Sequence, residues 1–170
     1  MNTKPPVTKT KASTTPGANP IHPPVIHRAA LAAGRWSGVE PLHYKQEGSA
    51  PFRDVSRQVL FGDAHMSAQL RYFEVQADGY TTLERHQHTH AVLVLRGHGT
   101  ALVGDTILSL AEHDLVTVPP LTWHQFRAPA DQPLGFLCMV NTERDRPQLP
   151  TPEELDALRA DPQLAAFLHD

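Results

Sequence analysis

One short segment of the chain, residues 84–90, alternates metal-binding side chains with other residues. A carboxylate and three imidazoles occupy every second position, at Glu84, His86, His88 and His90. An apolar run, residues 91–95, follows directly. Imidazole nitrogens and carboxylate oxygens are the ordinary ligands of divalent transition metals in proteins. We therefore expect the rest of the chain to enclose a metal bound at this segment.

The spacing of these side chains requires the backbone to bend. In an unbroken strand Glu84 and His90 would lie roughly 20 Å apart, because each residue advances the chain by about 3.3 Å. That separation is too large for two ligands of one ion. A bend at residues 87–89 would bring the strand that starts at His90 beside the segment that ends at His86.

A further ligand must come from a distant strand. His124 follows the turn-forming residues 118–122 and is the natural source. His88 can be read as a ligand, as a hydrogen-bond partner of a ligand or as a solvated turn residue. The predicted ligand set is Glu84, His86, His90 and His124.

Short apolar runs recur between turn-forming residues from residue 55 to residue 140. Many short runs at even spacing are typical of an all-β sandwich or barrel. No helix-length pattern interrupts them, which disfavours a parallel α/β sheet. Clear breaks fall at Asp78-Gly79 and at Pro119-Pro120. The predicted strands lie in the runs 59–61, 68–75, 80–85, 91–95, 101–103, 107–110, 115–118, 125–128 and 134–140.

The two ends of the chain differ from this central region. Residues 1–24 are rich in Pro, Thr and Lys and predict a disordered tail. Near the other end, Thr151, Pro152 and Glu154 form a capping-box pattern, and Asp161-Pro162 predicts a second helix start. The expected parts are a tail (1–24), an arm packed on the barrel (25–54), a barrel (55–142) and a helical extension (143–170).

Composition limits the classes of function. Hydrophobic residues make up 40% of the chain, and no apolar run approaches the roughly 18 residues of a membrane span. Residues 1–39 hold five of the 15 basic residues and no acid, so the remainder carries a net charge of -8, which argues against nucleic-acid binding. The single cysteine, Cys138, lies in an apolar run and is expected to be buried. One thiol cannot form an internal disulfide, which fits a cytoplasmic protein.

Two sequence motifs in the central region resemble those of the cupin superfamily, the small jelly-roll β-barrels. Residues 93–99 are similar to the strand and Gly-x-Gly turn that close the first cupin motif. His113-Asp114, Pro119-Pro120 and His124 resemble the second motif, and the likeness covers about residues 68–140. The resemblance implies a cupin β-barrel that holds one divalent transition metal ion, such as Fe, Mn, Ni or Zn, through three imidazoles and a carboxylate.

The match to the first cupin motif is not complete. Anchoring it on Gly97 puts His90 where cupins carry a glutamate, and Glu84 at the first histidine position. A competing register takes His86 and His88 as the histidine pair, but it places Val92 at the carboxylate position and loses the match at Gly97. We favour the first register on strand and turn geometry.

Four protein ligands on an ion that accepts six leave two adjacent positions for a substrate. Cupins include dioxygenases, isomerases, decarboxylases and sensors, so the resemblance alone does not select an activity. The first hypothesis is a metal-dependent, dioxygenase-like enzyme that acts on a small oxygenated organic molecule. The second is a non-catalytic small-molecule-binding or sensor protein, and the third is a metal-free barrel. The expected pocket walls are Tyr72, Trp123 and Phe126, and unpaired edge strands predict a homodimer.

Overall fold

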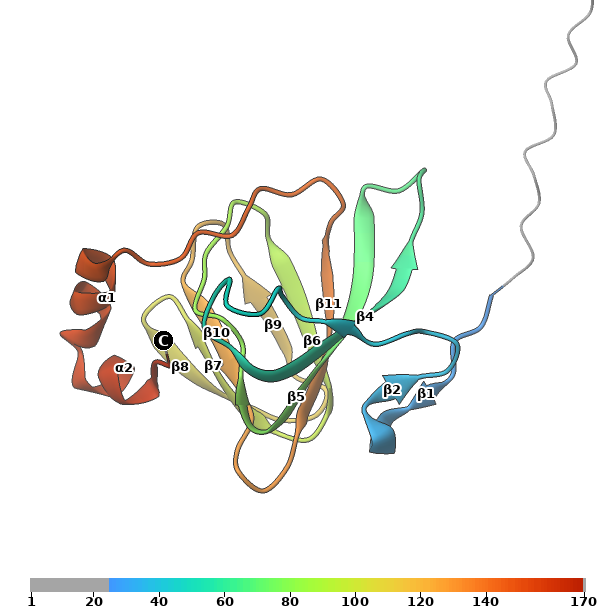
Figure 1. Ribbon diagram of the computed structural model, residues 1–170, viewed down its shortest axis with the longest axis horizontal. Coiled ribbons are helices and arrows are strands. Elements are labelled where there is room, and N and C mark those ends of the chain that lie inside the picture. Colours follow the sequence, from blue (N-terminus) through green and yellow to red (C-terminus); the bar gives the residue numbers. More distant parts are fainter. Residues whose placement is uncertain (1–24, 170) are drawn as a thin grey trace, which may run out of the picture.

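The computed structural model describes residues 25–169, so the tail predicted for residues 1–24 lies outside the described residues (Figure 1). Strands dominate this part of the chain, and two short helices follow them. The elements are β1 (Ala29–Ala30), η1 (Leu31–Ala33), β2 (Arg35–Trp36), β3 (Leu42–His43), β4 (Arg53–Gly62), β5 (Ala68–Tyr80), β6 (His90–Arg96), β7 (Gly99–Val103), β8 (Thr106–Leu110), β9 (Leu115–Val118), β10 (His124–Arg127), β11 (Leu134–Asn141), α1 (Pro152–Arg159) and α2 (Pro162–Phe167).

The large strands form one antiparallel sheet that curls on itself into a half-barrel (Figure 1). Its strand order is β8-β7-β10-β5-β11-β6-β9, and β4 joins it by pairing with β5. Strands that are far apart in the sequence are therefore neighbours, as in the pairing of β10 with β7 and of β6 with β9. The prediction of an all-β barrel is confirmed.

The longest strand, β5, differs from the prediction of two strands separated by a turn. It runs without interruption through Asp78 and Gly79. Asp78 adopts a left-handed conformation with φ of 62°, and its amide donates a hydrogen bond of 2.8 Å to the Pro129 carbonyl. A Cβ at Gly79 would approach the Arg53 carbonyl oxygen to 2.7 Å. Asp78 and Gly79 therefore bend the strand and allow the Arg53 backbone to approach closely, but they do not reverse the direction of the chain.

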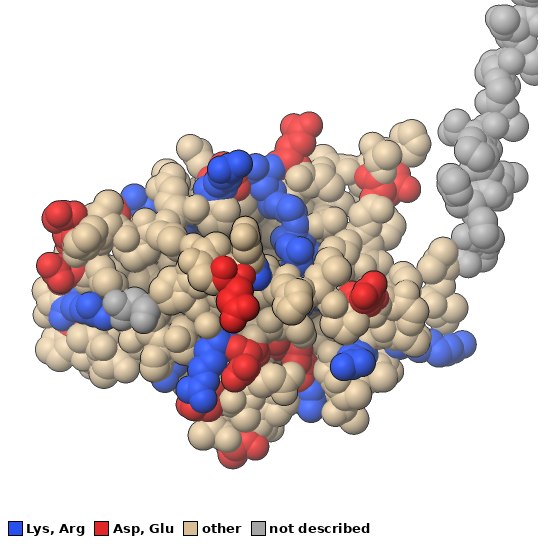
Figure 2. Space-filling model, viewed as in Figure 1, with Lys and Arg blue, Asp and Glu red and all other residues tan. Residues whose placement is uncertain are grey.

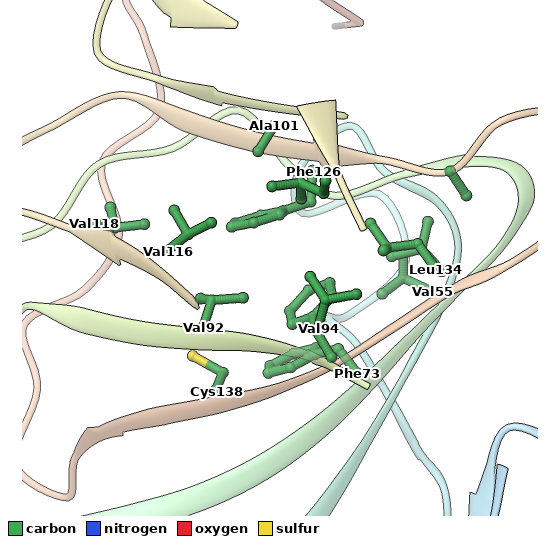
Figure 3. Close-up of a cluster of buried hydrophobic side chains, with 14 of the residues drawn as sticks. Val55, Phe73, Val92, Val94, Ala101, Val116, Val118, Phe126, Leu134 and Cys138 are labelled. Carbon is green, nitrogen blue, oxygen red and sulfur yellow. The ribbon is translucent and has the colours of Figure 1, made fainter. Parts of the chain in front are cut away.

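The core lies between the inner faces of the curled sheet (Figure 3). Phe136 stacks on Phe73 with ring centroids 5.4 Å apart and lies 4.9 Å from Phe126. Because side chains alternate along a strand, Phe73 on β5 points inward while its neighbours Tyr72 and Glu74 face the other side of the sheet. Full burial of each large apolar side chain stabilises the fold by roughly 1.5–3 kcal/mol.

The first part of the N-terminal arm, residues 29–36, packs against this other face of the sheet. Gly34 ends η1 in a left-handed conformation, with φ of 63°. Gln58 of β4 then accepts a hydrogen bond from the Trp36 amide (2.9 Å) and donates one to the Gly34 carbonyl (3.1 Å). Below the arm, the buried Glu74 carboxylate accepts hydrogen bonds from the Tyr72 hydroxyl and the Arg96 guanidinium.

The C-terminal helices begin where the sequence predicts them. The Thr151 hydroxyl accepts a hydrogen bond from the Glu154 amide (3.2 Å), and the Glu154 carboxylate accepts one from the Thr151 amide (3.0 Å). The apolar side chains of α2 pack on the outside of the barrel against Leu83 and Leu102. None of the helices in residues 25–169 is long and apolar enough to cross a bilayer.

The segment before α1 also ties the C-terminal extension to the barrel. Arg85 and Gln148 exchange backbone hydrogen bonds of 3.1 and 2.8 Å. The Arg85 guanidinium donates to the Glu154 carboxylate at 2.8 Å and lies over the Trp123 ring, 4.3 Å from its centroid. The extension thus contacts the residue that directly precedes His86.

Candidate metal centre

The chain bends at Gln87 and His88, so the segment carrying His86 folds back beside the start of β6. The ring centroids of His86 and His90 lie 4.3 Å apart. His124, at the start of β10, places its ring 4.8 Å from His86 and 5.5 Å from His90. One nitrogen from each of these rings lies within 4.8 Å of the other two. We call these residues the histidine triad.

Backbone hydrogen bonds fix the orientation of two rings of the triad. Nδ1 of His86 contacts the His88 carbonyl at 2.8 Å, and Nδ1 of His124 contacts the Thr122 carbonyl at 3.0 Å. A carbonyl can only accept, so each Nδ1 carries the proton and each Nε2 keeps a free lone pair. This is the arrangement of an imidazole that is ready to bind a metal.

Burial leaves nitrogens of the triad without partners. Nε2 of His86 and Nε2 of His90 are inaccessible and make no hydrogen bond with the residues that the structure describes. An unsatisfied buried polar group costs about 1–3 kcal/mol. A divalent cation bound to these lone pairs would remove that cost, so the residues present fit a metal ion.

The electrostatics of the triad keep its rings neutral. Burial, together with the neighbouring His124 and His88, lowers the pKa of His86 to about 4. Burial and the surrounding histidines lower the pKa of His90 to about 2, and burial also lowers the pKa of His124. Neutral imidazole is the form that binds metals, so at neutral pH few protons compete with the ion.

Glu84 lines the cavity into which the triad opens, but it lies outside the triad. Backbone hydrogen bonds of 3.2 and 3.0 Å join it to His124. Its buried carboxylate forms an ion pair with Lys45 of the N-terminal arm. Lys45 was not predicted as a site residue, because nothing in the sequence spacing connects the arm to residues 84–90.

His88 sits between the triad and the loop that follows β11. Its ring stacks on His86 with centroids 3.7 Å apart, and its Nδ1 contacts the Asp145 carboxylate at 2.8 Å. The same carboxylate accepts a 2.8 Å hydrogen bond from the Gln87 amide. Asp145 therefore holds the bend that brings the triad together, and it too was missed from the sequence.

The triad opens into a cavity of about 230 Å³. Of the three predicted wall residues only Phe126 lines it. Tyr72 lies on the other face of β5, against Trp36 of the arm. Trp123 packs beside the C-terminal helices. The thiol of Cys138 also lines the cavity, and burial raises its pKa to about 12.

An antiparallel half-barrel whose cavity is lined by a histidine triad defines a class of protein, and comparison with known families agrees. Residues 71–140 match the family described as the cupin domain, and the chain belongs to the cupin superfamily.

Among characterised proteins, the chain is similar to 1-methylthio-D-xylulose 5-phosphate methylsulfurylase of Rhodospirillum rubrum. The two are 61% identical over 134 residues, which is 79% of this chain and 86% of that protein. A cupin 2 conserved barrel domain protein from Rhodopseudomonas palustris is 54% identical, with a TM-score of 0.80 over 86% of this chain and 100% of the other. A cupin-2 domain structure from Rhodospirillum rubrum is 60% identical, with a TM-score of 0.74 over 78% and 89% of the two chains.

Proposed function

We propose that this protein is a metal-dependent enzyme that removes the methylthio group from a 1-methylthio ketose 5-phosphate. The observation that carries the proposal is the histidine triad, which lines a cavity and includes the buried, unpartnered Nε2 atoms of His86 and His90. The substrate class comes from the Rhodospirillum rubrum methylsulfurylase, which is 61% identical to this chain. In this proposal the triad would bind the metal, and a compound like the one named for the relative would bind in the cavity beside it.

The substrate named for the relative carries sulfur on C1, next to the C2 ketone of a xylulose. A divalent ion such as Fe, Mn, Ni or Zn, held by His86, His90 and His124, would polarise that ketone as a Lewis acid. The apolar side chains that share the cavity, among them Phe126 and Val92, exclude water from the reacting carbon. Glu84, paired with Lys45 in the same cavity, is the group that we assign to hold or deliver a proton.

The reaction balances with a small thiol as the acceptor. Attack of its thiolate on the substrate sulfur forms a disulfide bond and breaks the C1–S bond. The electron pair of that bond remains on C1, where the adjacent ketone delocalises it as an enolate. Uptake of one proton then gives the 1-deoxy ketose phosphate. Cys138 is not assigned as the internal thiol, because burial keeps its pKa near 12.

The direct test incubates the protein, loaded in turn with Mn, Fe, Ni or Zn, with 1-methylthio-D-xylulose 5-phosphate and a small thiol. Mass spectrometry should detect the 1-deoxy product and the mixed methyl disulfide. The metal-stripped protein and the His124→Ala variant should form neither. Absence of both products with all four metals would overturn the proposal.

Replacing Glu84 separates its role from that of a fourth metal ligand. Glu84→Gln should lower turnover by about 100-fold, within the usual contribution of a proton-transfer group, while the bound metal measured by elemental analysis stays unchanged. Loss of metal together with turnover would instead assign Glu84 to the ligand set, as the sequence predicted.

A dioxygenase-like reaction at the same triad is the second candidate function, favoured by the neutral nitrogen ligands. Oxygen consumption with the methylthio substrate or with small diketones would support it. Tight ligand binding without any turnover would support the sensor hypothesis instead.

A further inference from the structure

Three arginines line the cavity that contains the histidine triad. They are Arg57 of β4, Arg71 of β5 and Arg144 in the loop after β11. Figure 2 shows Lys and Arg side chains gathered around a hollow in the upper part of the face that it presents. The nitrogens of the histidine triad and these three guanidinium groups thus line the same cavity.

The pairing of the strands explains why two of these arginines point inward. Residues directly opposite each other in an antiparallel pair share a face of the sheet. Arg57 lies opposite Phe73, and Arg71 lies opposite Cys138. Phe73 and Cys138 both belong to the buried core, so the guanidinium groups enter the barrel from its inner face.

The carboxylates that line this cavity are paired with other groups, Glu84 with Lys45 and Asp145 with His88. Within residues 25–169 no carboxylate forms an ion pair with Arg57, Arg71 or Arg144. Nε of Arg57 is buried and has no hydrogen-bond partner among the described residues. In the described part of the chain, Arg71 donates only to Gln69 (2.6 Å), and Arg144 donates to the Asn141 carbonyl (3.0 Å) and more weakly to Gln69.

The three arginines also repel one another. Burial, followed by the charges of Arg144 and Arg57, lowers the pKa of Arg71 to about 10. Other cations of the barrel, such as Lys45, Arg85 and Arg96, each have a carboxylate partner. Cations held together in a cavity without carboxylate partners of their own are the arrangement expected where an anion binds.

We propose that Arg57, Arg71 and Arg144 form the subsite for the phosphate group of the substrate. The inference rests on the proposed function for its substrate class, and it adds the residues that select the phosphorylated form. Guanidinium groups bind phosphate oxygens through paired hydrogen bonds, which Lys or Gln cannot reproduce. The phosphate would anchor one end of the sugar while the carbon that carries sulfur lies at the triad.

Inorganic phosphate titrated into the metal-free protein, at constant ionic strength, tests the subsite. Calorimetry should detect binding to the wild type, and phosphate should raise its melting temperature. Arg57→Gln and Arg71→Gln should each weaken binding by about 10- to 100-fold, the usual value of a charge-assisted contact. The control is Arg53→Gln, which changes an exposed arginine of the same strand that pairs with Asp78, and it should bind phosphate like the wild type.

Substrate selectivity provides a second measurement. D-xylulose 5-phosphate should compete with inorganic phosphate in the wild type, whereas D-xylulose should not. Arg57→Lys and Arg71→Lys retain the charge and should give intermediate affinities. The Gln variants should melt no lower than the wild type without phosphate, because they remove cations that repel one another. Equal phosphate affinity in the wild type and the Gln variants, or no binding to the wild type, would overturn the subsite.

The histidine triad allows the subsite and the proposed reaction to fail separately. The His124→Ala variant should keep its affinity for phosphate after losing its metal. If phosphate binding depends on the arginines but the methylthio substrate is not converted, the subsite stands and the proposed reaction is wrong.

Discussion

The three histidines of the triad and the neighbouring His88 have different roles. His86, His90 and His124 present nitrogens to one point, whereas His88 is engaged with Asp145. We expect alanine at any triad position to abolish stoichiometric metal binding, and His88→Ala to weaken it by only about 10-fold. Elemental analysis of untagged protein measures this, with His65→Ala as the control outside the cavity. Equal losses at His88 and at the triad would favour the competing register.

The thiol of Cys138 should be chemically silent in the folded protein. Because burial raises its pKa to about 12, almost no thiolate exists at pH 8. Alkylation by iodoacetamide should be at least about 100-fold slower than in the unfolded chain, and its rate should rise steeply only as the pH approaches 12. Fast labelling of native protein at pH 8 would show that the cavity wall opens to solvent.

At the scale of the elements, the arm and the sheet meet at a buried charge. Glu74 is 1% exposed, and Arg96 supplies its positive partner. Arg96→Met should lower the free energy of unfolding by about 3 kcal/mol, because it leaves a buried carboxylate without a cation. Urea denaturation measures the loss. Adding Glu74→Gln should restore most of it, and a double variant as unstable as the single one would contradict this role.

The sequence predicts those elements whose signals are local. The capping box at Thr151 and Glu154 and the bend at residues 87–89 both appear as predicted. The continuity of β5 could not be predicted from the sequence. Asp78-Gly79 is a pair that usually forms a turn, but here a hydrogen bond between Asp78 and the distant Pro129 fixes the path of the backbone.

The site, like the fold, could be predicted only where its signals are local in the sequence. The triad follows from alternation and from the second motif, but Lys45 and Asp145 reach it from remote segments that carry no spacing signal. The inward face of β5 did have a signal: strand alternation puts Tyr72 on the face opposite to Phe73 and Val75, which would have excluded Tyr72 from the cavity.

At the scale of the whole molecule, the expected homodimer stays a prediction. Among the residues that the structure describes, the outer edge of β4 pairs with β3 only at Ser56 and Arg57, so most of this edge of a ten-residue strand has no strand partner there. Light scattering coupled to size exclusion should give the mass of two chains. Phe61→Lys, a change at an exposed position of this strand, should give monomers, while Ile107→Lys on β8 should not. A monomeric wild type would refute the prediction.

The hydrogen bonds that join Arg85 to Gln148 and Glu154 determine what is lost when the chain is shortened. Arg85 directly precedes His86, so the C-terminal extension supports the backbone segment that carries the first imidazole. A chain cut back to its barrel would still curl and would still carry every donor atom. Its first imidazole would lose this one support, and we expect the proposed metal site to bind an ion less tightly.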